Sequence, residues 1–168
     1  MERLKRFREK LSPFSSLEHK DFRLFILGFF ISQLGFQSLT IAISWQMYQL
    51  TKSALSLGLI GIVSVIPTIL FSMIGGIVAD KVDRKKLLII TQLGFVLVAL
   101  MLGLLTYFDQ ITPTLIYLII AFQFTITAFY APVRQSIIPN IVPKKSLLNA
   151  VSLNTLARQS AIIIGPSI

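Results

Sequence analysis

Long uncharged intervals alternate with short charged segments along this chain. The uncharged stretches run from 24 to 51, 53 to 79, 87 to 108 and 110 to 133. Each is longer than the roughly 20 apolar residues that an α-helix needs to cross the hydrocarbon core of a bilayer. The pattern therefore predicts an all-α membrane protein with four complete spans. We expect these helices at about 24–50, 54–79, 87–108 and 112–133.

A fifth apolar stretch begins near Leu147 and is still running at Ile168. It contains a single charge, Arg158, and no polar flank closes it. We expect a fifth helix at 147–168, cut short by the end of the chain. The first 23 residues precede the spans and form a basic tail.

Basic residues gather in alternate connections between the predicted helices. Seven lie in the tail 1–23, four in the loop 80–86 and three in the loop 134–146. The turns at 51–54 and 108–112 hold only Lys52, which Asp109 opposes. Because cytoplasmic loops carry the excess of Lys and Arg, the tail and the two basic loops are predicted to be cytoplasmic. The two turns are then external.

Composition supports the same interpretation. Of 168 residues, 54% are hydrophobic and 14% are charged, whereas soluble domains have about 45–50% and 25%. A net charge of +9 in a soluble chain would indicate nucleic-acid binding. Here most of the basic residues lie on one predicted side of the membrane. We therefore expect a lipid bilayer as partner and no nucleic acid.

The basic tail has two open interpretations. Leu4, Phe7 and Leu11 share one helical face among basic residues, which is typical of a short helix lying on an anionic membrane surface. A solvated tail fits equally well. The apolar run after the tail is too long for a signal peptide's core of about 7–15 residues, so we expect it to remain as a helix.

Polar side chains inside the spans are candidate binding groups. Gln33, Gln37, Ser44 and Tyr48 recur at spacings near four on the first helix. Such a stripe must face other helices or water. Lining of a substrate cavity and hydrogen bonding between helices both explain it.

Arg158 is the single charge within the fifth helix. It lies about 17 Å from Leu147 along a helix with 1.5 Å rise per residue, and a charge at such depth is a functional-site hypothesis by default. The first four spans contain no Asp or Glu. Its counter-charge is an anionic substrate, a carboxylate outside these residues, or only backbone carbonyls and water.

The second helix carries two backbone features. Pro67 lies in mid-span and predicts a kink, which could also serve as a hinge. Gly75 and Gly76 follow near its end, where small residues permit close approach of a neighbouring helix.

The loop after this helix resembles motif A of the major facilitator superfamily, G-x-x-x-D-[RK]-x-G-R-[RK]. The matching residues are Gly76, Asp80, Lys81, Arg84 and Lys85. Asp83 stands where the motif has Gly, and Asp tolerates turns through local hydrogen bonds. The resemblance implies a gating loop that locks the cytoplasmic side closed, with Asp80, Arg84 and Lys85 in a switchable charge network.

Further stretches are similar to bacterial exporters of the enterobactin-exporter and macrolide-efflux kind, at 32–61 and 131–150. Ala161, Gly165 and Pro166 resemble part of motif C, a mark of drug:proton antiporters, with Ala161 in place of its first Gly. The fourth helix lacks the basic residue of motif B. The resemblance implies a bacterial inner-membrane protein and a fold of twelve helices, of which these residues hold the first five.

We therefore expect secondary active efflux of a small molecule, drug or siderophore-like, with protons as coupling ion. An anionic substrate is favoured by Arg158. The alternatives are an uptake symporter of the same superfamily and a truncated fragment that does not transport. No enzyme, metal or cofactor is expected, since the chain has no cysteine and a single histidine, His19, in the polar tail.

Overall fold

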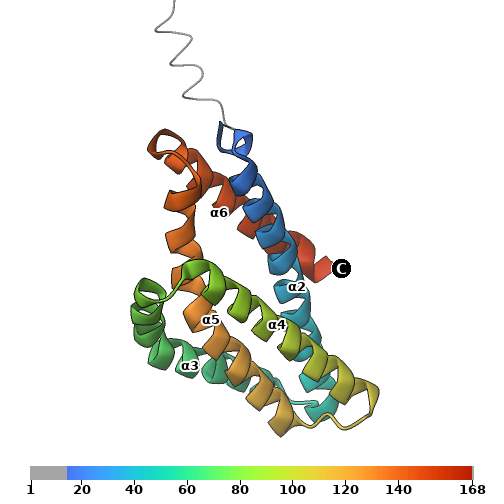
Figure 1. Ribbon diagram of the computed structural model, residues 1–168. Helices are drawn as coiled ribbons and strands as arrows, with labels where there is room; N and C mark the ends of the chain where they lie inside the picture. The colour runs from blue at the N-terminus through green and yellow to red at the C-terminus, as the bar shows by residue number, and fades with distance from the viewer. Residues whose placement is uncertain (1–14, 168) are drawn as a thin grey trace, which may run out of the picture. The chain divides into compact units, whose positions relative to one another are not determined.

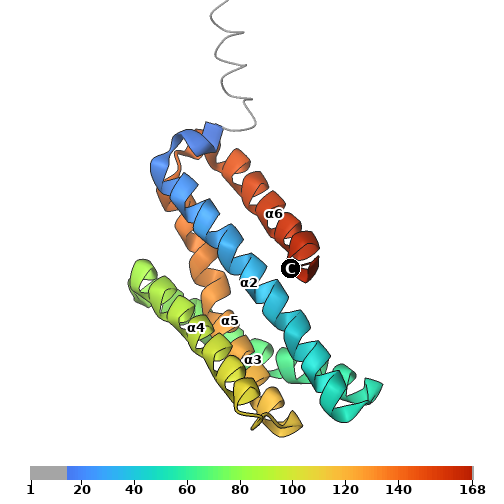
Figure 2. The same cartoon turned by 90° about the vertical axis from the view of Figure 1, so that its right-hand side faces the viewer.

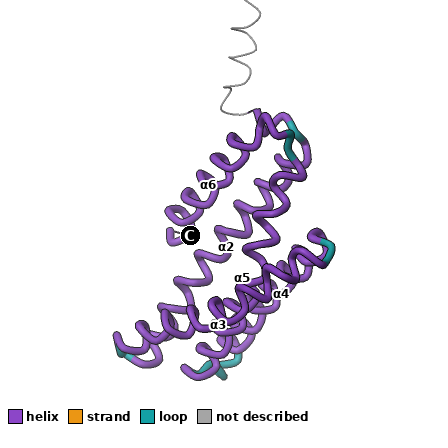
Figure 3. The backbone as a smooth tube through the Cα atoms, turned by 90° about the vertical axis from the view of Figure 1, so that its left-hand side faces the viewer, coloured by secondary structure: helices purple, strands orange, loops and turns teal. Residues whose placement is uncertain are grey.

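A computed structural model describes residues 15–167, and every regular element among them is helical (Figures 1 and 3). In chain order the elements are η1 (Ser15–Glu18), α2 (Lys20–Thr51), α3 (Ala54–Lys81), α4 (Arg84–Tyr107), α5 (Pro113–Ile141), η2 (Lys144–Ser146), α6 (Leu147–Ile164) and η3 (Gly165–Ser167). Only short connections separate them, as the teal segments of Figure 3 show. This confirms the all-helical prediction.

Four of the helices, α2 to α5, are long and apolar enough to cross a membrane. The fifth, α6, is 18 residues long and is not among the four. Its sequence includes Asn149, Asn154, Arg158 and Gln159, which lower its mean hydropathy.

Several helices extend beyond the uncharged intervals. α2 begins at Lys20 rather than near 24, and α5 continues to Ile141 rather than ending near 133. Absence of charge marks the apolar part of a span, whereas the helical backbone continues into the polar flanks. α5 passes Pro132 and Pro139 and ends two residues before Pro143, so a proline alone does not determine where it stops.

The chain divides into two compact units. Among the described residues, the first unit comprises 15–39 and 136–167, and the second comprises Thr40–Gln135. α2 and α5 each contribute to both units.

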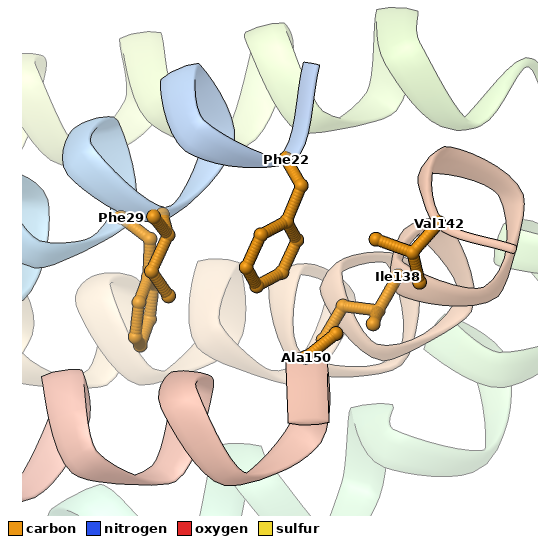
Figure 4. Close-up of a cluster of buried hydrophobic side chains, with 6 residues drawn as sticks. Phe22, Phe29, Ile138, Val142 and Ala150 are labelled. Carbon is orange, nitrogen blue, oxygen red and sulfur yellow. The ribbon is translucent and has the colours of Figure 1, made fainter. Parts of the chain in front are cut away.

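The first unit has an apolar core made by three helices. Phe22, Ile26 and Phe29 from α2 meet Ile138 and Val142 from the end of α5, and Ala150 from α6 (Figure 4). Phe22 and Ala150 are fully buried. Both residues belong to one cluster of buried side chains, and such clusters have the dense packing of protein interiors.

Polar contacts fasten η1 to the start of α6 in the same unit. The backbone N–H of Ser16 donates to Asn149 Oδ1 at 3.1 Å. The Ser16 hydroxyl lies 2.8 Å from the same oxygen and 3.0 Å from the Ser146 carbonyl. We call these three residues the Ser16 clasp.

The second unit is held by contacts of α3, α4 and α5. Phe71 packs on Phe129, and Phe95 meets Tyr130 edge to face at 5.5 Å between ring centroids. The Tyr117 hydroxyl donates to the Ser56 carbonyl at 3.0 Å. These contacts align α3 and α4 along α5.

Candidate functional site

The loop that resembles motif A joins α3 to α4 in the second unit. Asp80 and Lys81 end α3, while Arg84 and Lys85 begin α4. Asp80, Lys81 and Lys85 are exposed, and Arg84 is half-buried. The four charged groups therefore lie at the two helix ends that this short loop connects.

Asp83 caps the start of α4. Its carboxylate accepts hydrogen bonds from the backbone N–H of Lys85 at 2.8 Å and of Lys86 at 3.2 Å. These donors would otherwise lack a partner, as do the first N–H groups of any helix. The φ of Asp83 is −54°, so this position does not require glycine. The prediction that Asp replaces the motif glycine through local hydrogen bonding is confirmed.

Gly75, not Gly76, makes the close approach between helices. A Cβ on Gly75 would lie 2.4 Å from the carbonyl oxygen of Ala128 on α5. This distance is too short for any side chain at position 75. A Cβ on Gly76 would meet nothing within 4 Å among the described residues. Within the described residues the close approach is therefore made at Gly75, and the motif A role of Gly76 stays a prediction.

The Ala128 carbonyl lacks the usual hydrogen bond from the residue four positions later in α5. Pro132 stands four residues later inside the helix and has no N–H to donate to it. The absent side chain of Gly75 lets the α3 backbone come close to this carbonyl, in the manner of the weak Cα–H···O contacts found between close helices. Gly75 and Pro132 thus act at the same point of the α3–α5 contact.

The polar residues of α2 have separate local contacts. In the first unit, Gln33 and Gln37 are half-buried. In the second, the Ser44 hydroxyl donates to the Thr40 carbonyl of its own helix at 2.9 Å. Tyr48 is exposed, with the Lys52 ammonium 5.7 Å from its ring centroid. Cavity lining by these residues stays a prediction.

α6 lies beside α2 in the first unit (Figure 2), and residues that resemble motif C stand at this contact. Ala161 and Gly165 are buried, and Pro166 is exposed. A Cβ on Gly165 would lie 2.6 Å from Gln37 Cβ, and the Ser38 hydroxyl reaches the Gly165 carbonyl at 2.9 Å. Small residues here allow the two helices to approach, as in other membrane helix pairs.

Arg158 lies on the exposed side of α6. Three further polar side chains of α6 are exposed with it, namely Ser152, Thr155 and Gln159. We call these four residues the polar face of α6. Sequence reasoning found only Arg158, although the spacing of the other three residues would have placed them on one helical stripe.

A second polar group that sequence reasoning missed is Gln123 on α5. Its side chain is 1% exposed, and its amide nitrogen has no hydrogen-bond partner among residues 15–167. Leu4, Phe7 and Leu11, which carry the interfacial-helix prediction, lie outside the described residues.

Comparison with known proteins identifies the class to which these helices belong. A family profile described as "Transmembrane secretion effector", within the major facilitator superfamily, matches residues 11–168. The chain is 32% identical over 146 residues to the "Staphyloferrin A transporter" of Staphylococcus aureus, covering 86% of this chain and 35% of that protein. It is 22% identical over 130 residues to "Macrolide efflux protein A" of Streptococcus pyogenes, covering 77% and 32%. No solved structure matches.

The chain is therefore a multi-pass membrane protein of transporter type. It belongs to the major facilitator superfamily, as the motif A resemblance predicted. It spans about a third of the length of the curated relatives that it matches. Those relatives are named as a transporter and an efflux protein.

Proposed function

We propose that this chain supplies the first helices of a twelve-helix exporter in the bacterial inner membrane, with a cytoplasmic N-terminus. The exporter moves a small molecule outward by alternating access, coupled to proton antiport. Efflux-type relatives support the direction. The uneven distribution of Lys and Arg supports the orientation.

Arg158 carries the proposal for the substrate. Its guanidinium is exposed on α6, about 17 Å along the helix from Leu147 at 1.5 Å per residue. In the fifth span that the sequence predicts, a charge at this depth costs at least about 2.5 kcal/mol. The chain has no Asp or Glu after Asp109. An organic anion in a water-filled cavity satisfies this charge, so the proposed substrate is a small anionic molecule.

The charged loop between α3 and α4 serves as the gate. The Asp80 carboxylate pairs with the basic groups of Lys81, Arg84 and Lys85, or with a helix N-terminus of the remaining protein. Asp80 changes from one partner to the other when the cytoplasmic side opens. Gly76, which is open within the described residues, provides room for that approach.

Everted membrane vesicles containing the complete transporter test the proposal. We expect them to accumulate radiolabelled benzoate, protocatechuate or citrate, but not the cation ethidium, when a proton gradient is imposed. Arg158→Gln should lower anion accumulation at least about tenfold, because one lost charge-assisted contact is worth about 1.5–3 kcal/mol. Lys145→Gln, at an exposed loop position, is the matched control and should transport normally.

Two results would contradict parts of this proposal. Undiminished anion accumulation by Arg158→Gln would remove the anion-binding role. Accumulation confined to right-side-out vesicles would identify an uptake symporter instead of an exporter.

A further inference from the structure

The polar face of α6 differs from the other exposed helix faces of this protein. On α3, the exposed residues from Leu55 to Ile77 are apolar or glycine, apart from Ser72. Such a surface suits contact with lipid chains. α6 exposes apolar residues too (Leu148, Val151, Leu156 and Ile162 to Ile164), but among them stand four polar side chains, Ser152, Thr155, Arg158 and Gln159. Polar and charged side chains within spanning segments face a protein interior or a water-filled cavity.

The two hydroxyl groups of this face act as hydrogen-bond acceptors toward a ligand. Ser152 Oγ donates to the Leu148 carbonyl at 3.0 Å, and Thr155 Oγ1 donates to the Val151 carbonyl at 3.0 Å. Each hydroxyl has a single proton, and the helix backbone uses it. What remains on each oxygen is acceptor capacity. In this arrangement the two positions offer acceptor oxygens to a ligand.

The donors lie beside these acceptors. Arg158 presents a guanidinium with donors only, and Gln159 presents an amide that both donates and accepts. Along the helix axis, Thr155 is about 4.5 Å and Ser152 about 9 Å from Arg158, at 1.5 Å per residue. A cationic group and a row of acceptors thus follow one another over two helical turns.

We propose that the polar face of α6 binds an organic anion that also carries hydroxyl or amide N–H groups. Arg158 binds the negative group. Thr155 and Ser152 accept hydrogen bonds from O–H or N–H groups of the ligand. These groups lie roughly 5–9 Å from its negative group, a separation set by the helical rise. Gln159 contacts the polar edge of the same ligand. This inference rests on the proposed anion transport and adds the determinants that select among anions.

Three aromatic probes separate the two elements of recognition. Protocatechuate carries a carboxylate and ring hydroxyls, benzoate carries only the carboxylate, and catechol carries only the hydroxyls. Their binding to the complete transporter in nanodiscs would be measured by isothermal titration calorimetry. We expect wild type to bind protocatechuate more tightly than benzoate by about threefold to tenfold for each hydroxyl that donates a hydrogen bond.

Thr155→Val keeps the side-chain shape and removes the acceptor. It should lower protocatechuate affinity about threefold to tenfold and leave benzoate unchanged, and Ser152→Ala should have the same selective effect. Ser72→Ala on α3 removes a hydroxyl from an exposed apolar surface, so it is the matched control and should change neither. Arg158→Gln should weaken both anions and leave catechol unchanged.

The outcomes distinguish this inference from the proposed function. If Thr155→Val and Ser152→Ala leave the preference for protocatechuate intact, or weaken both anions equally, the hydroxyl-selecting role is overturned while anion transport stands. If Arg158→Gln leaves benzoate binding unchanged, the anion-binding role itself fails. Absence of binding of both anions to wild type at millimolar concentration overturns both.

Discussion

Two adjacent glycines in α3 meet different surroundings. Gly75 lies against the Ala128 carbonyl of α5, whereas Gly76 faces open space among the described residues. The first is therefore needed for packing within the second unit. The second is available for the gating role that motif A implies.

Alanine at these two positions should separate stability from transport. Gly75→Ala should lower the free energy of unfolding by about 1–3 kcal/mol, because its methyl group overpacks the contact with Ala128. Gly76→Ala should leave stability unchanged or raise it by up to about 1 kcal/mol through better helix propensity. Thermal unfolding in detergent would measure both. Equal destabilisation by the two variants would contradict the assignment of the contact to Gly75.

Asp83 should behave as a helix cap. Asp83→Ala removes the acceptor for the Lys85 and Lys86 N–H groups and should cost about 1 kcal/mol of stability. Asp83→Gly, which restores the motif A residue, should cost only a few tenths of a kcal/mol. Asp83→Asn keeps the cap and is the control. A loss with Gly as large as that with Ala would argue against capping as the role of this side chain.

At the scale of elements, the Ser16 clasp ties the segment before α2 to the start of α6. Ser16 is fully buried and Ser146 nearly so, so their polar groups have no access to water in the folded state. A buried donor that loses its partner costs about 1–3 kcal/mol. The clasp therefore fixes where α2 begins relative to α6 in the first unit.

Removing Asn149 should release this segment. Asn149→Ala leaves the Ser16 N–H without its acceptor and should lower stability by about 1–3 kcal/mol. Hydrogen–deuterium exchange should rise at residues 16–20 in particular. Asn140→Ala is the control, because Asn140 is exposed and donates to the Ser136 carbonyl of its own helix. Unchanged exchange at 16–20 would show that the clasp does not hold this segment.

Sequence was sufficient to place the helices because an uncharged apolar run of over about 20 residues has few other solutions in a membrane protein. It was not sufficient for their ends: α5 passes Arg134 and stops only before Pro143. The choice between Gly75 and Gly76 was also beyond sequence, since it depends on a carbonyl 53 residues later (128 − 75). Arg158 could be found as a lone charge, whereas its exposure could not.

At the scale of the whole molecule, the distribution of basic residues determines the expected orientation. Tail and loops with 14 of the 16 Lys and Arg residues alternate with turns that hold only Lys52. Because such residues are retained on the cytoplasmic side, the turn after α4 should face outward and the loop before α6 inward. This orientation is a prediction that labelling can test directly.

These 168 residues contain no cysteine, so an introduced cysteine gives this part of the protein a single labelling site. Gln110→Cys and Lys145→Cys place thiols at exposed positions in the connections after α4 and after α5. A membrane-impermeant maleimide should label Gln110→Cys in intact cells and Lys145→Cys only after permeabilisation. Lys52→Cys should behave like Gln110→Cys, since both turns lie on the same predicted side. The opposite pattern would invert the topology, and it would place the charged motif A loop on the external side, where it could not act as a cytoplasmic gate.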